Sequence, residues 1–132
     1  MQQRDHLFTL EEANRLLPVV RQLMAELQEG KATLVERTET FDTMLERAGG
    51  NGHMKEDPGQ ARQQAEKKAI EMQRLFNELD GLGVELKGID QGLVDFPSLR
   101  DGRVVYLCWH LGEESIAYWH EMDAGFAGRQ PL

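Results

Sequence analysis

An apolar stripe with helical spacing extends from Ala13 to Leu45 and constrains the fold more than any other feature of this sequence. Its apolar residues recur at gaps of three or four, with charged residues on the other faces. Thr9 and Glu12 precede the stripe at the spacing of a capping box, in which each side chain accepts a hydrogen bond from the backbone of the other. The pattern predicts a helical segment about 57 Å long at 1.5 Å per residue.

Two residues disturb this segment. Pro18 lies about two turns inside it and removes a backbone hydrogen bond, which predicts either a kink or a short first helix. Gly30 costs about 1 kcal/mol relative to alanine in a helix interior. The stripe is weakest around Gly30.

The segment AGGNGHMKEDPG, residues 48–59, breaks the helical pattern, because its glycines and Pro58 do not propagate a helix. A second amphipathic stretch follows, from Ala61 to Leu82, with small residues in its first half. Residues 1–82 are therefore predicted to form a long antiparallel helical hairpin with a loop at 48–59. We interpret the Met residues of both stripes as core packing.

From Gly83 the period changes to alternation in short β-prone runs, at 84–89, 92–96, 103–111 and 116–122. Asp101-Gly102 has the signature of a tight hairpin turn, and the second run is predicted to end at Pro97. The chain is thus predicted to be one α+β domain, residues 1–132. In it the helical hairpin, with its first helix kinked near Pro18, precedes a small antiparallel β-meander of three or four strands and a Gly-rich tail in residues 83–132.

The faces of the last two strands depend on the loop that joins them. If this loop holds an even number of residues, Leu111 faces Ile116 and Leu107 faces His120. His120 then lies on an apolar face together with Trp109. The opposite face carries another set of side chains: Tyr106, Cys108, His110, Trp119 and Glu121.

Cys108 and His110 point to the same side of a strand, and Glu121 is expected diagonally opposite Cys108. Such a trio is compatible with Zn²⁺, but a structural zinc site has four ligands and a paired Cys motif is missing. A nucleophilic Cys108 activated by His110 would need a third group to orient the imidazole. A buried structural thiol is the simplest interpretation.

His120 is the better candidate for a ligand site. We expect it either to bond a carbonyl or carboxylate, or to act as a ligand or general base. The candidate ligand-binding residues are His120, Arg129, Glu113, Trp119 and Asp95. A divalent metal would be held by His120 and Glu113. No catalytic residue is assigned.

The tail Gly125-Phe126-Ala127-Gly128-Arg129 is open to two interpretations. Its glycines allow backbone N–H groups to converge on an anion, with Arg129 as an added donor. Alternatively, the tail folds over the sheet with Phe126 as an anchor and Arg129 paired to a carboxylate. The strand, loop and helix of a true phosphate loop are missing.

The charge balance narrows the classes of partner. The chain has a formal charge of −8, which disfavours nucleic acid and anionic lipid surfaces. No apolar run is long enough for a membrane helix, and the N-terminal residues do not resemble a signal peptide. With a single Cys, these features predict a cytoplasmic protein.

Three stretches carry a resemblance to a known family: FTLEEANRLLP at 8–18, LVDFPSLRDGRVVYLCWHLGE at 93–113 and YWHEMDAGFAGRQPL at 118–132. They resemble an uncharacterised bacterial and archaeal family called domain of unknown function 2203. The resemblance covers nearly the whole chain apart from the 48–59 loop. It implies a small soluble prokaryotic protein and no particular activity. At position 110 the resemblance implies a basic residue rather than a fixed His, which weakens the zinc interpretation of Cys108 and His110.

Two functions follow as expectations. Long helices with surplus apolar surface favour a homo-oligomer, a dimer or dimer of dimers, that acts through its assembled surface without catalysis. The alternative is a small-ligand or metal-binding protein, with or without enzymatic activity. Its site lies around His120 and the Gly-rich tail with Arg129.

Overall fold

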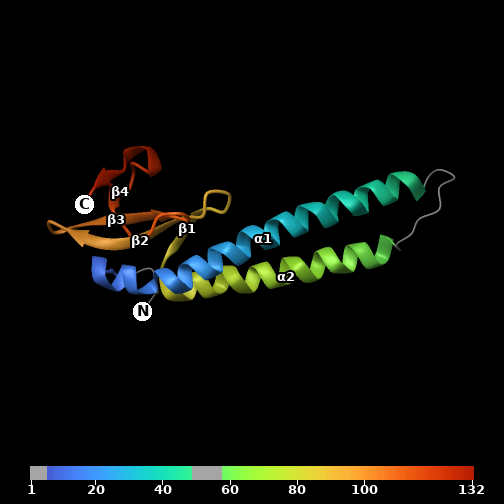
Figure 1. The fold of residues 1–132 in the computed structure, drawn as a ribbon, viewed down its shortest axis with the longest axis horizontal. Coiled ribbons are helices and arrows are strands. Elements are labelled where there is room, and N and C mark those ends of the chain that lie inside the picture. Colours follow the sequence, from blue (N-terminus) through green and yellow to red (C-terminus); the bar gives the residue numbers. More distant parts are fainter. Residues whose placement is uncertain (1–5, 49–57) are drawn as a thin grey trace.

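The computed structural model describes residues 6–48 and 58–132, which form two helices followed by a five-stranded antiparallel sheet (Figure 1). The elements in chain order are α1 Leu10–Ala48, α2 Pro58–Leu82, β1 Glu85–Gly88, β2 Leu93–Arg100, β3 Arg103–His110, β4 Tyr118–Glu121, the 3₁₀ helix η2 Phe126–Gly128 and β5 Gln130–Pro131. The predicted α+β class is confirmed. Of the predicted 48–59 loop, residues 49–57 lie outside the described part of the chain.

The capping box at the start of α1 is present as predicted. The Glu12 N–H donates to Thr9 Oγ1 at 3.1 Å, and the Thr9 N–H donates to Glu12 Oε1 at 3.4 Å. From there α1 runs for 39 residues through Pro18, so a short first helix is wrong, while the kink near Pro18 stays a prediction. Gly30 lies where α2 approaches, because a Cβ at this position would be 3.1 Å from Met72 Cγ.

The core lies between the helices and one face of the sheet. From the helices it takes Ala13, Leu17, Val20, Leu23, Met24, Leu27, Met72 and Leu79. From the sheet it takes Val94, Phe96, Val105, Leu107, Trp109 and Trp119. The side chains of Phe41, Met44 and Leu45, at the far end of the predicted stripe, lie outside the described part of the chain. The far ends of the two helices extend away from the sheet as an arm (Figure 1).

The sheet is a meander in the order β1-β2-β3-β4-β5. It has more strands than the three or four predicted, because the end of the Gly-rich tail adds β5 beside β4. The prediction that the second strand ends at Pro97 is wrong, since β2 continues to Arg100. The pairing of β1 with β2 extends only to Asp95, so the missing N–H of Pro97 leaves no bond to β1 unmade.

The predicted Asp-Gly turn joins β2 to β3. Asp101 and Gly102 have positive φ angles of 51° and 80°, as a type I′ turn requires, and Arg100 pairs with Arg103 across it. This turn fixes the register of β2 against β3.

No helix of the described residues is both long and apolar enough to cross a membrane.

We predict that Thr9→Ala lowers the free energy of unfolding by about 1 kcal/mol, because the Glu12 N–H loses its acceptor. Chemical denaturation followed by circular dichroism measures this loss. Thr38→Ala, an exposed position inside the same helix, is the matched control and should not destabilise. Equal stability of Thr9→Ala and the parent protein would contradict the role of the cap.

Candidate functional site

The register of β3 against β4 differs by one residue from the one predicted. Tyr106 pairs with His120 and Cys108 pairs with Tyr118, whereas Leu107 was expected opposite His120. A shift of one residue turns every side chain of a strand to the other face. His120 therefore lies on the face away from the helices, and its predicted position on the apolar face is wrong.

The same shift moves Trp119 in the opposite direction. Trp119 pairs with Leu107 and is buried in the core, with the Arg100 guanidinium 4.4 Å above its ring centroid. It was expected among the ligand-binding residues, but it faces the helices instead.

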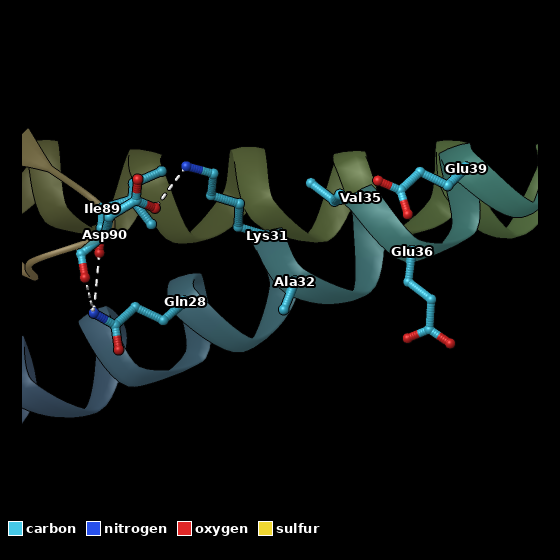
Figure 2. A pocket seen from close by; sticks show the side chains of 8 residues that line it. All are labelled: Gln28, Lys31, Ala32, Val35, Glu36, Glu39, Ile89 and Asp90. Atoms are coloured by element: carbon cyan, nitrogen blue, oxygen red, sulfur yellow. Dashed lines mark hydrogen bonds and ion pairs between the residues drawn. The ribbon is translucent and has the colours of Figure 1, made fainter.

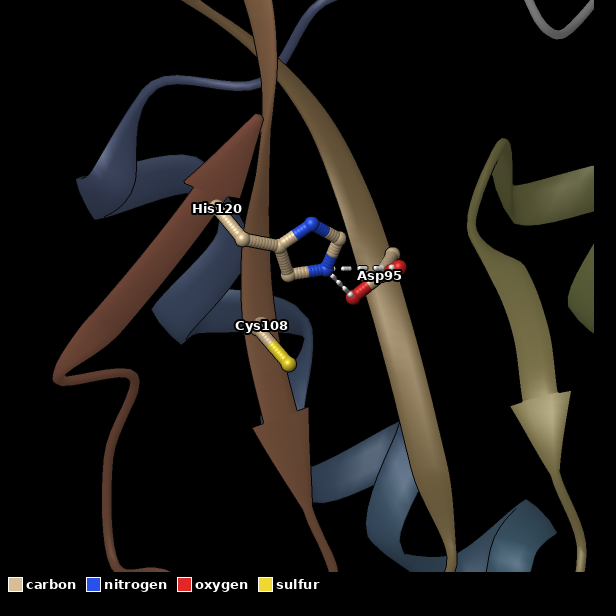
Figure 3. Close-up of side chains that lie close together, drawn as sticks. All are labelled: Asp95, Cys108 and His120. Carbon is tan, nitrogen blue, oxygen red and sulfur yellow. Dashed lines mark hydrogen bonds and ion pairs between the residues drawn. The ribbon is translucent and has the colours of Figure 1, made fainter. Parts of the chain in front are cut away.

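On the outer face of the sheet, Asp95, Cys108 and His120 form a cluster (Figure 3). They come from the adjacent strands β2, β3 and β4, and Asp95 is the direct cross-strand partner of Cys108. One potential ligand atom of each lies within 4.8 Å of the others. The cluster is almost sealed from solvent, since the three residues are 2%, 0% and 2% exposed.

His120 is held from both ring nitrogens. Its Nδ1 lies 2.7 Å from the carbonyl oxygen of Glu121, which only accepts, so Nδ1 carries a proton. Its Nε2 lies 3.0 and 3.1 Å from the two carboxylate oxygens of Asp95, so one proton must lie between Nε2 and Asp95. Burial raises the pKa of the Asp95 carboxyl above its ordinary value, while the charge and hydrogen bond of His120 oppose the rise.

Cys108 carries a protonated thiol. Burial, and after it the charge of Asp95, raise the pKa of the thiol to about 12. An activated nucleophile needs the opposite, a lowered pKa. The environment of Cys108 therefore gives no support to a nucleophilic role.

The trio weighed from the sequence, Cys108 with His110 and Glu121, does not assemble. The carboxylate of Glu121 is bound by Arg103 at the surface. The Nδ1 of His110 lies 3.0 Å from the Leu111 carbonyl. The residues that do gather around Cys108 are Asp95 and His120.

Arg129 and Glu113, two further predicted site residues, pair with each other. Arg129 Nη2 donates to the Glu113 carboxylate oxygens at 2.7 and 3.0 Å and to the Cys108 carbonyl at 3.2 Å. The Arg129 guanidinium also lies 4.2 Å from the Tyr118 ring centroid. Glu113 therefore binds Arg129, and it is not part of the cluster that contains His120, although a metal pair of His120 and Glu113 was expected.

Glu113 also organises the connection between β3 and β4. Its Oε1 accepts from the His110 N–H at 2.9 Å, and its carbonyl accepts from Trp109 Nε1 at 2.9 Å. The side chain is 17% exposed, so it is largely withdrawn from solvent.

Two backbone N–H groups of the tail are engaged within the tail itself and are not open to an anion. The N–H of Gly128 donates to the Gly125 carbonyl at 3.0 Å, and the N–H of Arg129 donates to the Phe126 carbonyl at 3.2 Å. Phe126 is half exposed and is a weaker anchor than expected. Arg129 carries the expected pairing to a carboxylate.

A groove of about 510 Å³ lies between α1 and the turn that joins β1 to β2 (Figure 2). Gln28 Nε2 crosses it to donate to the carbonyls of Ile89 and Asp90, and Lys31 pairs with the Asp90 carboxylate at 2.6 Å. These contacts join α1 to the turn, which is a structural role.

Comparison with known proteins agrees with the resemblance seen in the sequence. A family model described as an uncharacterized conserved protein (DUF2203) matches residues 6–132. The chain belongs to this family. No curated protein and no solved structure matches the chain. Membership in the family assigns no activity, so the function must be argued from the cluster itself.

Sequence reasoning singled out Asp95 and His120 separately but missed that they meet at Cys108. The pairing of Asp95 with Cys108 could have been derived from the sequence. The Asp101-Gly102 turn pairs Arg100 with Arg103, and counting back along both strands pairs Asp95 with Cys108. The position of His120 could not be derived in this way, because it depends on the register of β4. That register is set by an irregular connection without a recognisable turn motif.

We predict that Cys108 of the native protein is alkylated far more slowly than in the unfolded chain. Raising the thiol pKa from 9.0 to about 12 lowers the reactive thiolate fraction about a thousandfold at mildly alkaline pH, and burial slows the reaction further. Mass spectrometry after timed exposure to iodoacetamide, with and without guanidinium chloride, gives both rates. Similar rates in the two conditions would show that Cys108 is accessible.

Proposed function

We propose that this protein binds a divalent transition-metal ion of the Zn²⁺ type through Asp95, Cys108 and His120. The observation that carries the proposal is the convergence of three different ligand atoms, within 4.8 Å of one another, on a buried face. Thiolate sulfur, imidazole nitrogen and carboxylate oxygen are all ligands of Zn²⁺. A thiolate disfavours Mg²⁺ and Ca²⁺, which prefer oxygen.

The orientation of His120 supports this proposal. A metal-binding imidazole usually donates its other N–H to a carbonyl or carboxylate, which fixes the tautomer. The bond from Nδ1 to the Glu121 carbonyl does this here and leaves Nε2 directed at Asp95. A metal ion would replace the proton that now lies between Nε2 and the carboxylate.

The charge balance of the cluster also supports binding of a divalent ion. Burying an unpaired charge is costly, so a buried site is favoured when its charges cancel. One divalent ion balances the carboxylate of Asp95 and a thiolate of Cys108, with His120 neutral. Three protein ligands leave one position of a tetrahedral ion for water or another small ligand.

We predict that the protein, freed of metal and then given Zn²⁺, binds one ion per chain. Zn²⁺ at a hundredfold excess over its dissociation constant should stabilise the fold by about 2.7 kcal/mol. Native mass spectrometry measures the stoichiometry, and thermal unfolding measures the stabilisation. Cys108→Ser and His120→Ala should each abolish both effects.

His110→Ala is the matched control, because His110 lies two residues beyond Cys108 on β3 and outside the cluster. It should keep the bound ion and the stabilisation. Unchanged zinc binding in Cys108→Ser and His120→Ala would end the proposal.

A second proposal, self-association into a dimer or dimer of dimers, rests on a different observation. In the described part of the arm formed by α1 and α2, Val35 is 47% exposed and Ile70 is 65% exposed, and Val35 also lines the groove beside the β1–β2 turn. A two-helix arm buries such residues when it packs against a second copy as a bundle. The assembled surface would then be the functional unit.

For this second proposal we predict a multiple of the chain mass in sedimentation velocity at micromolar concentration. The variant with both Val35→Glu and Ile70→Glu should sediment as a monomer, because it would bury two carboxylates at the interface. Leu99→Glu, an exposed apolar position on the sheet, is the control and should keep the assembly. A monomeric parent protein would exclude this proposal without touching the metal proposal.

A cytoplasmic location and weak affinity for nucleic acid stay predictions from the composition. Both rest on the acidic charge balance and the single Cys.

A further inference from the structure

Arg129 is held beside the metal-ligand cluster by the C-terminal tail. The tail is fixed to β4 by pairing of Tyr118 with Pro131, and the Leu132 N–H donates to the Ala117 carbonyl at 2.9 Å. This brings the Arg129 guanidinium against the ring of Tyr118, which is the cross-strand partner of Cys108. Arg129 therefore lies next to Cys108 on the outer face of the sheet, and its Nη2 donates to the Cys108 carbonyl.

Within the described part of the chain, one buried nitrogen of this guanidinium has no hydrogen-bond partner. Arg129 Nε is buried, and no atom of the described residues accepts a hydrogen bond from it. A buried donor without an acceptor is costly, so such atoms are rare unless another state of the protein satisfies them. Loading the cluster with a metal ion creates a new acceptor nearby, since the thiol of Cys108 becomes a thiolate.

We propose, on the basis of the metal proposal above, that Arg129 is a positioning residue of the metal site. In the loaded protein its guanidinium donates a hydrogen bond to the Cys108 thiolate and holds the sulfur toward the ion. Arg129 does not touch the metal. It acts through the ligand.

The charge of Arg129 would repel a divalent ion if it were not balanced. Glu113 balances it through bonds of 2.7 and 3.0 Å to Nη2, in a setting where the two side chains are 17% and 12% exposed. Glu113 is itself fixed by the His110 N–H. The pair therefore offers N–H donors to the sulfur while adding no net charge beside the ion.

Groups that hydrogen-bond to metal ligands typically change metal affinity by about 10- to 100-fold when they are removed. Lysine keeps the charge of Arg129 but has neither Nε–H nor the planar fork. Arg129→Lys thus separates the hydrogen bond from the charge.

The test uses Co²⁺ as the probe, because it enters zinc sites and its near-ultraviolet charge-transfer band reports on the bound thiolate. We expect Arg129→Lys to bind Co²⁺ about tenfold more weakly. We also expect its band at lower energy, because a sulfur that loses a hydrogen bond gives up electrons more readily. A purely structural role for Arg129 would weaken binding without moving the band of the loaded protein.

Arg103→Lys is the matched control, since Arg103 binds a carboxylate on the same sheet but at the surface, and it should match the parent protein. Glu113→Gln provides a second variant should Arg129→Lys fail to fold. This substitution weakens the hydrogen bonds that position Arg129. The charge-transfer band of the Co²⁺-loaded variant should therefore also move to lower energy, but by less than in Arg129→Lys.

If Arg129→Lys or Glu113→Gln folds and its charge-transfer band does not move, the role of Arg129 is overturned. The proposed metal site is not affected by that result. Absence of any thiolate band in the parent protein loaded with Co²⁺ would instead overturn the metal site. The two failures are therefore distinguishable.

Discussion

The structure depends on burial of β3 from both sides. One face, with Leu107 and Trp109, packs on the helices, and the other face carries Cys108, which is also fully buried. An antiparallel sheet with helices on one side usually leaves its other face in water. Here the Gly-rich tail lies on the side of the sheet opposite the helices (Figure 1). Polar side chains on this second face must therefore bond to one another, and the pairs Asp95 with His120 and Arg129 with Glu113 satisfy most of that demand. In the described part of the chain, only the buried Nε of Arg129 finds no acceptor.

The connection between β3 and β4 decides which residues meet. It is anchored from α1, since Asn14 Oδ1 accepts from the Ile116 N–H at 2.9 Å and Arg21 donates to the Glu114 carbonyl at 3.3 Å. The tail anchors it from the other side, through Arg129 and Glu113. The two contacts from α1 join residues that are far apart in the sequence. They set the register of β4, and through it they place His120 beside Cys108 instead of in the core.

These contacts explain what could be predicted and what could not. The helical hairpin, the capping box and the Asp101-Gly102 turn follow from local spacing, and all three are confirmed. The register of β4 rests on long-range contacts, so assuming an even loop placed His120 on the wrong face. For the site, Asp95, His120, Arg129 and Glu113 could be singled out by residue type. Their grouping into two pairs, and the place of Cys108 in one of them, required the three-dimensional arrangement.

The cluster can keep the same net charge with and without an ion. Without metal, one proton lies between His120 and Asp95, and the thiol of Cys108 is protonated, so the charges of the three residues sum to zero. With a divalent ion, these two protons leave, and the carboxylate and thiolate balance the metal. Exchange of two protons for one divalent ion therefore adds no charge to the buried face. Since neither state would bury an uncompensated charge, the metal proposal does not require the fold to depend on the ion in the way a zinc finger does. The proposed site would thus be formed in advance, and we expect its affinity to depend on how well the ligands and Arg129 are held rather than on folding around the ion.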